Sequence, residues 1–302
     1  MEETVFSHPR HDRRAIRPFE ERSDGRGLIR LGAHLAVLAL TAAAIAAARG
    51  SVLLPLAMLL HGIALTFLFA AEHETIHRTA FRSRWLNDIV AWIAGLVLLL
   101  PPAYFRYFHF AHHRHTQDPE RDPELASPKP TNLADWFKQA SGWPYWRGQI
   151  GVLAGHARGR VTAAFIPARN RAEVISEARI FLAIYLAAIV LSVASGTDLL
   201  LIYWVIPALL GQPFLRLYLM AEHTGCPLVP DMLANSRTTR SNAAVRFIAW
   251  NMPYHAEHHA YPSVPFHRLP GLHRLLHADI GMVARGYFEV QCSIVRQFSR
   301  SF

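Results

Sequence analysis

The sequence predicts an all-α integral membrane protein with a histidine-rich part that faces water. Of the 302 residues, 52% are hydrophobic and only 18% are charged, whereas a soluble domain carries nearer a quarter charged residues. The apolar residues gather in runs of about 20, the length of a helix that crosses a bilayer. Nine of the 18 histidines gather in clusters close to those runs. This pattern excludes a disulfide scaffold, a disordered chain and a simple soluble enzyme.

Four apolar runs are the predicted spans. They cover residues 28–48, 51–71, 174–194 and 199–221. Each has about the number of residues that a bilayer requires. Arg49 and Gly50 join the first two runs, and a four-residue link joins the last two. We therefore expect two antiparallel hairpins.

Positive charge sets the predicted orientation. Seven arginines lie between Arg10 and Arg30, against one, Arg49, in the first connection. Because positive residues concentrate on the cytoplasmic side, we expect residues 1–27 to form a mobile polar tail in the cytoplasm. Residues 28–302 then form one membrane domain whose C-terminus is also cytoplasmic. We interpret the formal charge of +9 in the same way, as a cytoplasmic face and not as a nucleic-acid surface.

Residues 86–100 form a fifth apolar run, which is short for a span. A single crossing there would also place the histidines before and after it on opposite sides of the membrane. We therefore expect an in-plane or re-entrant helix. Trp136, Trp143, Tyr145 and Trp146 predict further helices at the membrane interface, between the two hairpins.

Four histidine clusters lie at or just beyond the cytoplasmic ends of predicted helices. They comprise His73 and His77; His109, His112 and His113; His223; and His255, His258 and His259. Histidines three or four residues apart share one face of a helix, so each cluster can point at one centre. One tetrahedral zinc takes at most four ligands. Nine imidazoles suit two ions of octahedral type with open positions, and imidazole is compatible with iron.

The first cluster alone permits a different interpretation. His73-Glu74-Thr75-Ile76-His77 matches the HExxH pattern of zinc proteases, in which Glu74 would be the general base. Such a membrane zinc hydrolase would hold a single metal and would leave the two HxxHH clusters unexplained. A membrane protein that binds metal without catalysis is a further alternative.

Together the clusters resemble the three histidine boxes of the membrane fatty acid desaturase and hydroxylase superfamily. Residues 73–77, 109–113 and 255–259 match those boxes in order, spacing and position relative to the spans. His223, at a helix end, looks like the additional ligand of integral-membrane alkane hydroxylases. The stretch 250–262 looks like the third box of acyl and sphingolipid desaturases.

This resemblance implies a non-haem di-iron centre, with two iron ions held by the nine histidines and no catalytic residue beyond the metal centre. Such a centre uses O2 and two external electrons to abstract hydrogen from an unactivated C–H bond. A second abstraction gives an alkene, which makes a fatty acyl (lipid) desaturase the leading function. Hydroxyl rebound gives an alcohol, so a hydroxylase of alkyl chains or of a small amphiphile is the alternative.

The resemblance also implies an electron donor of the ferredoxin, rubredoxin or cytochrome b5 type. We expect a separate donor protein, because the chain has no CxxC pair and no His-Pro-Gly-Gly haem motif. The expected setting is the inner or plasma membrane of a bacterium.

Further polar residues are candidates for supporting roles. Four glutamates adjoin ligand histidines: Glu72, Glu74, Glu222 and Glu257. We expect them to accept the second ring N–H of those histidines. Asn251, four residues before the third box, is expected to reach the metals through water. Asp118 and Asp122 are expected to cap or salt-bridge the loop after the second box.

Arg216 lies inside the fourth span, where a charge is costly and often functional. Gln212, Arg216 and His223 fall on one helix face. Arg216 and Gln212 are therefore predicted to bind a carboxylate or other polar end of the substrate. The alternative is that Arg216 snorkels to the membrane interface.

Overall fold

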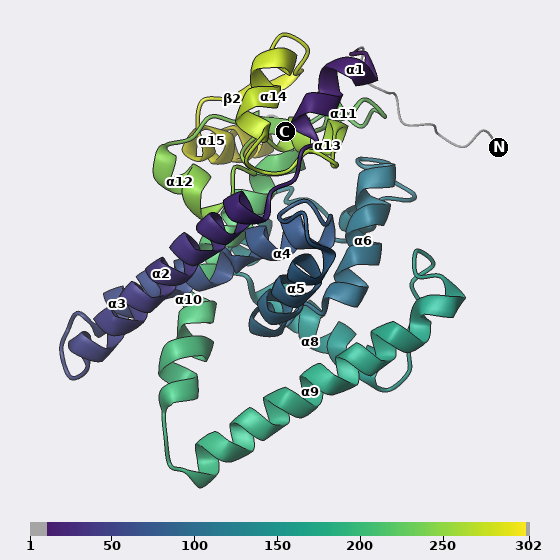
Figure 1. The fold of residues 1–302 in the computed structure, drawn as a ribbon. Coiled ribbons are helices and arrows are strands. Elements are labelled where there is room, and N and C mark those ends of the chain that lie inside the picture. The colour runs from purple at the N-terminus through teal and green to yellow at the C-terminus, as the bar shows by residue number, and fades with distance from the viewer. Residues whose placement is uncertain (1–10, 300–302) are drawn as a thin grey trace.

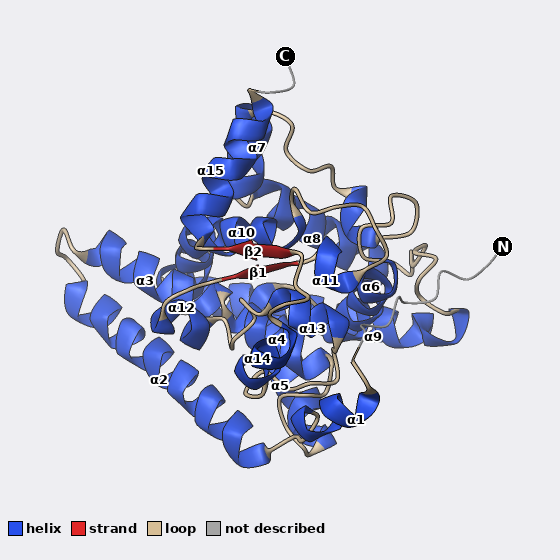
Figure 2. Cartoon of the chain, turned by 90° about the horizontal axis from the view of Figure 1, so that it is seen from above, coloured by secondary structure: helices blue, strands red, loops and turns tan. Residues whose placement is uncertain are grey.

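The computed structural model describes residues 11–299, which fold almost entirely into helices (Figures 1 and 2). Four helical segments are long and apolar enough to cross a membrane: Asp24–Ala48, Leu54–Ile76, Ala168–Ala194 and Leu201–His223. Each overlaps one predicted span, so the predicted all-α architecture with four spanning helices is confirmed. The first ten residues of the predicted tail lie outside the described part of the chain.

The first hairpin consists of α2 (Asp24–Ala48) and α3 (Leu54–Thr66), which pack along each other. Gly50 makes the turn with a φ of 79°, a conformation that residues with a Cβ rarely adopt. After a one-residue break the span continues as α4 (Leu68–Ile76), five residues beyond the predicted end. This extension places His73 inside the helix, where its direction is fixed.

The fifth apolar run becomes a sharply bent pair, α5 (Arg84–Leu98) and α6 (Pro102–His115). The axes bend by 97°, because Leu99 ends α5 in the left-handed region and the next helix begins at a Pro-Pro pair. A bend of this size occurs in a re-entrant loop and in a broken span, so the in-plane or re-entrant helix stays a prediction. The bend brings α6, which carries the second histidine box, to the end of α4.

Two further helices follow, α7 (Leu133–Ala140) and α8 (Trp143–Ala157), after a short 3-10 turn, η2 (Pro123–Ala126). They lie where the aromatic residues predict interfacial helices, and the Trp143 side chain is 66% exposed.

The second pair of spans is more open than the first. A 3-10 turn, η3 (Ala168–Asn170), leads into α9 (Arg171–Ala194), and a π-helical turn, η4 (Leu201–Val205), leads into α10 (Ile206–His223). In Figure 1, α9 and α10 meet at a short connection and diverge from it. α9 lies against α8, and α10 lies along α3.

The crossing of α3 and α10 depends on two glycines. A Cβ at Gly62 would lie 1.9 Å from the Pro207 carbonyl oxygen, and one at Gly211 would lie 2.1 Å from the Gly62 carbonyl oxygen. Small residues of this kind let two helix backbones approach closely in a membrane. The close crossing fixes the position of α10 along the axis of α3. It therefore also fixes the position of His223, at the end of α10, relative to α4.

The remaining elements build a cap over one end of the helices. They are α11 (Met232–Asn235), β1 (Arg237–Thr239), α12 (Ala243–Ile248), α13 (His255–Ala260), α14 (Leu269–Leu276), β2 (Met282–Ala284) and α15 (Tyr287–Phe298). The two strands pair in parallel, with Thr238 opposite Val283. Arg237 is buried and donates to the carbonyl oxygens of Ala221 and Thr224. It thereby neutralises the negative end of α10.

The segment before α2 belongs to this cap. α1 (Arg13–Ile16) and η1 (Arg17–Phe19) lie against it, and Ile16 is buried in the same cluster as Leu269. His11 is 2.8 Å from Asp279, and the Ser263 hydroxyl donates to Glu20. The prediction of a mobile tail is therefore wrong for residues 11–23. The partners of this segment lie more than 240 residues away, so no local pattern indicates them.

Candidate metal centre

Four elements bring the nine predicted histidines to one place beneath the cap. α4 carries His73 and ends at His77, α6 carries the second box, α10 ends at His223, and α13 carries the third box. The segments are far apart in the sequence, but the bend between α5 and α6 and the crossing of α3 with α10 make their ends meet.

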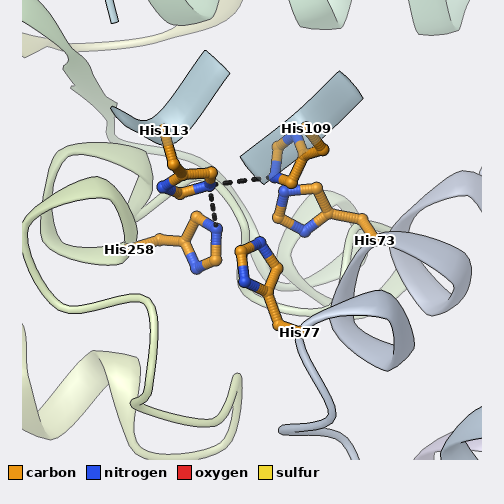
Figure 3. A group of neighbouring side chains, drawn as sticks. All are labelled: His73, His77, His109, His113 and His258. Atoms are coloured by element: carbon orange, nitrogen blue, oxygen red, sulfur yellow. Dashed lines mark hydrogen bonds between the residues drawn. The ribbon is translucent and has the colours of Figure 1, made fainter. Parts of the chain in front are cut away.

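Five of the histidines form one group, which we call the first group: His73, His77, His109, His113 and His258. One ring nitrogen from each lies within 4.8 Å of the others, and Figure 3 shows the five rings around a common centre. The Nε2 atom of His113 is 2.9 Å from that of His109 and 3.2 Å from that of His258.

The other four form the second group: His112, His223, His255 and His259. His112, His223 and His259 bring ring nitrogens within 4.8 Å of one another. His255 joins them, because its Nε2 is 2.9 Å from the Nε2 of His223. The two groups are neighbours, since the rings of His113 and His259 stack with centroids 4.1 Å apart.

The residues present fit two metal ions. With metal–nitrogen bonds of about 2.1 Å, adjacent ligands on one octahedral ion lie about 3 Å apart, which matches the Nε2 separations within both groups. The Nε2 atoms of His77 and His259 are buried and have no hydrogen-bond partner in the described chain, although buried polar atoms are usually paired.

Burial also keeps the cap histidines neutral. It lowers the pKa of His255, His258 and His259 well below the ordinary value, and the other imidazoles lower it further. A neutral imidazole has the free lone pair that a metal ion requires.

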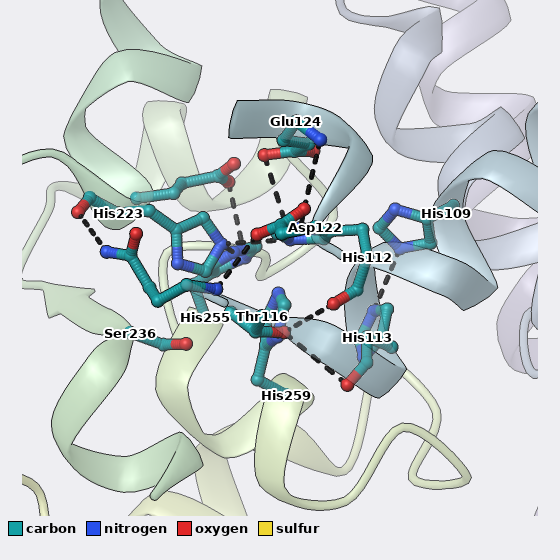
Figure 4. A network of polar contacts seen from close by, with 12 residues as sticks. His109, His112, His113, Thr116, Asp122, Glu124, His223, Ser236, His255 and His259 are labelled. Carbon is teal, nitrogen blue, oxygen red and sulfur yellow. Dashed lines mark hydrogen bonds and ion pairs between the residues drawn. The ribbon is translucent and has the colours of Figure 1, made fainter. Parts of the chain in front are cut away.

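Hydrogen bonds at the outer ring nitrogens orient the second group (Figure 4). The Nδ1 atom of His112 is 2.9 Å from Asp122 Oδ1, that of His223 is 3.3 Å from the Asn235 carbonyl, and that of His259 is 3.2 Å from Thr116 Oγ1. In each case Nδ1–H donates outward and Nε2 is left for a metal. Such partners raise the basicity of a ligand histidine and fix its ring.

Asp122 caps the loop after the second box as predicted, but its contact with the ligand histidine His112 is not part of that prediction. It is buried, and besides His112 it accepts from the backbone N–H groups of Gln117 and Glu124. Asp118 has the predicted loop role, since it pairs with Arg121. The Asp-Pro motif occurs twice in this loop, and nothing in the local sequence separates the two aspartates.

Glu124 also lies close to the centre, which the sequence does not predict. Its Oε2 lies 3.7 Å from the Nε2 atom of His112, on the side of the ring that faces the second group. It is the carboxylate that comes nearest to a metal-facing nitrogen among the ion pairs of the described chain.

Of the predicted supporting glutamates, only Glu222 contacts a ligand histidine, with Oε1 3.3 Å from His255 Nδ1. The prediction for Glu74 is wrong. Its Oε2 accepts from Thr79 Oγ1 and from the Phe266 N–H at 3.0 and 3.1 Å. Successive residues on a helix point about 100° apart, so Glu74 faces the cap while His73 faces the centre.

The predictions for Glu257 and Asn251 also differ from the structure. Glu257 bonds with Thr238 and His273, both outside the ligand set. Asn251 donates its side-chain amide to the Phe266 carbonyl at 3.0 Å. Both residues therefore hold the cap together: Glu257 lies on α13 but bonds away from the centre, and Asn251 lies in the turn before that helix.

A cavity of about 1300 Å³ reaches the histidines of both groups. Phe69 and Met220 are among its apolar lining residues, and Tyr145 and Arg216 are among its polar ones. The Arg216 guanidinium lies 4.3 Å above the Tyr145 ring. Arg216 is therefore directed at α8 and the cavity, and Gln212 is buried one turn earlier on α10.

Fold and site together define a class: a helical integral membrane protein with a buried, histidine-built centre able to bind metal. A model of the fatty acid desaturase family matches residues 49–291. The chain therefore belongs to the fatty acid desaturase family.

Individual relatives are more distant. The chain is 25% identical over 251 residues to an sn-1 oleoyl-lipid 12-desaturase of Synechocystis, a match that covers 75% of this chain and 68% of the relative. A desaturase of the same name from Anabaena variabilis is 36% identical over 86 residues, 28% of this chain and only a quarter (25%) of the relative. A zeaxanthin 4-ketolase of Chlamydomonas reinhardtii is 38% identical over 76 residues, which cover 24% of this chain and 17% of the relative.

Proposed function

We propose that this protein is an O2-dependent di-iron desaturase that removes hydrogens from an acyl chain of a lipid. The observation that carries the proposal is the division of nine histidines, eight of them buried and His77 half-buried, into groups of five and four, each spaced for one ion. Membership of the fatty acid desaturase family and the names of its relatives support a lipid substrate.

In this proposal the histidines of the two groups hold two iron ions, which supply oxidation of an unactivated C–H bond with O2 and two electrons. The chain's own residues do the remaining work. Asp122 and Glu222 keep His112 and His255 in their ligand orientation. Phe69, Leu215 and Met220 line an apolar path on which an acyl chain excludes water from the centre.

Two features weigh against the zinc hydrolase. Nine imidazoles exceed the need of one tetrahedral zinc. Glu74, the base that such an enzyme requires, bonds to Thr79 and Phe266 and does not face the histidines. Hydroxylation at the same centre is the second candidate, and the short match to a ketolase favours it, because that name denotes oxygen insertion and not hydrogen removal.

We also propose the setting of the reaction. The electrons come from a separate protein of the ferredoxin, rubredoxin or cytochrome b5 type. The centre lies between the cap and the helices. The cap and both termini face the cytoplasm of a bacterium. The excess of arginine before α2 over the first connection supports this orientation.

The test combines metal analysis with product analysis on the detergent-purified protein. We expect close to two irons per chain in the wild type and a loss of both in the double variant His112→Ala, His258→Ala, which removes one ligand from each group. His277→Ala, at a histidine outside both groups, is the matched control and keeps both irons.

With an electron-donor system and membrane lipids, an alkene product that requires O2 supports the desaturase, and an alcohol or ketone supports the second candidate. One zinc per chain that persists in the double variant, with no O2 consumed, would refute both and restore the hydrolase.

A further inference from the structure

Arg216 is a charged group within a membrane-spanning helix that has no counter-ion of its own. In the described part of the chain it makes no ion pair, and its Nε is buried without a hydrogen-bond partner. Glu124 and Glu222 act on it only from a longer distance. Taking an unpaired charge out of water is costly, and charged residues in a span are typically functional.

Two glutamines near this end of the cavity also have unpaired polar atoms. Gln212 is 1% exposed, and neither polar atom of its side chain has a partner among the described residues. Gln149 Oε1 is in the same situation. A Cβ at Gly142 would lie 2.5 Å from Gln212 Cγ and 3.9 Å from Arg216 Cγ, so the two side chains lie side by side against that turn.

This polar region opens into the cavity of the metal centre. Arg216, Tyr145 and Gln149 all line it. Tyr145 and Gln149 are four residues apart on α8 and therefore share a face. Arg216 precedes His223 by seven residues on α10, which corresponds to about 10 Å along the helix.

We propose that Arg216, assisted by Gln149, binds the oxyanion of an anionic amphiphile, a carboxylate or a phosphate, whose apolar chain then extends to the histidines. The inference rests on the proposed function and specifies its substrate class. A guanidinium has a planar set of donors that matches an oxyanion in a bidentate manner. A lipid that offers only neutral esters would leave the charge unpaired.

The site also determines which carbon of the substrate's acyl chain is oxidised. An oxyanion fixed at Arg216 places the reacting carbon about 10 Å away, so the position of reaction is counted from the polar end. The sn-1 oleoyl-lipid desaturases act by name on lipid-bound chains; a phosphate at Arg216 gives a substrate of that kind, and a carboxylate gives a free fatty acid.

The test is equilibrium binding to the full-length, metal-loaded protein in detergent. The probes are oleate, oleoyl lysophosphatidate and methyl oleate, which carry a carboxylate, a phosphate and no charge, respectively. We expect one of the two anions to bind at least tenfold more tightly than methyl oleate, and Arg216→Gln to remove this preference without changing the binding of methyl oleate.

Arg216→Lys, which keeps the charge, is expected to retain part of the preference. Arg114→Gln, at an exposed arginine on the same cavity, is the matched control and retains all of it. The metal content and Tm of each variant show that it is folded. The anion that depends on Arg216 identifies the source of the oxyanion.

The inference would be overturned if Arg216→Gln weakened the binding of methyl oleate as much as that of the anions. It would also be overturned if Arg216→Gln kept the preference for an anion. These results differ from those expected if the proposed desaturase function is wrong. If anions bind through Arg216 but no O2-dependent product forms, the oxidation is refuted and the binding site stands. If neutral lipids are oxidised equally by the wild type and Arg216→Gln, the function stands and the binding site is refuted.

Discussion

Asp122→Asn tests whether the two histidine groups hold separate ions. Asp122 accepts three hydrogen bonds, from His112 Nδ1 at 2.9 Å, Gln117 N–H at 2.8 Å and Glu124 N–H at 2.9 Å. Within the described residues it makes no hydrogen bond or ion pair with the first group. Its removal should therefore affect the second group and leave the first intact.

The magnitude follows from the contacts. Loss of a carboxylate that orients a ligand histidine costs about 10- to 100-fold in metal affinity, which is about 1.4 to 2.8 kcal/mol. An asparagine amide keeps one acceptor oxygen and presents an NH2 group to at least one of the donors that Asp122 binds. That mismatch costs a further 1 to 3 kcal/mol or so in stability.

The assay is metal content after dialysis against graded concentrations of a chelator. We expect Asp122→Asn to lose one of its two ions at a chelator concentration 10- to 100-fold below that for the wild type, and to keep the other. Asp118→Asn, which removes an exposed partner of Arg121 in the same loop, should titrate like the wild type. Simultaneous loss of both ions, or an unchanged titration, would refute the division into two groups.

Three further predictions concern the framework. Glu74→Gln should lower the Tm, because a buried acceptor is replaced, yet leave the metal content unchanged; loss of metal would show that Glu74 does support the centre. Gly62→Ala should prevent the crossing near Pro207 and abolish the yield of folded protein, measured by size-exclusion chromatography, whereas Gly32→Ala, with open space around it, should behave like the wild type. Finally, the lowered pKa of His258 means that the unfolded chain takes up a proton near pH 6.5 that the folded, metal-free chain does not. Its Tm should therefore be highest above that pH and fall on acidification, and a Tm that rises would contradict the assignment.

The spans and the ligand histidines could be predicted because their signals are local. A run of about 20 apolar residues has few alternatives to a membrane helix, and spacings of three and four place His255, His258 and His259 on one face. The expectation that each cluster points at one centre is wrong, because His109 and His113 join the first group while His112, on the same helix, joins the second. The meeting of these faces follows from the bend between α5 and α6 and from the close crossing of α3 with α10, neither of which a local pattern predicts.

The supporting residues could not be predicted from adjacency. Glu74 and Glu257 each adjoin a ligand histidine, but a helix turns neighbours away from each other. Asp122, ten residues after His112, becomes its partner only because the loop folds back. Likewise, the contacts of Ile16 with the cap depend on the tertiary fold and have no signature in the first 27 residues.

The two histidine groups differ in how their members are spread along the chain, and this has a consequence for biosynthesis. Four of the five members of the first group lie between His73 and His113, whereas the second group has one member there and needs His223 and the third box. As synthesis runs from the N-terminus, a nascent chain holds most of one coordination sphere before the second hairpin exists. Maturation should thus pass through a form with a single ion, and the last ion to enter locks the newly made cap onto helices already in the bilayer.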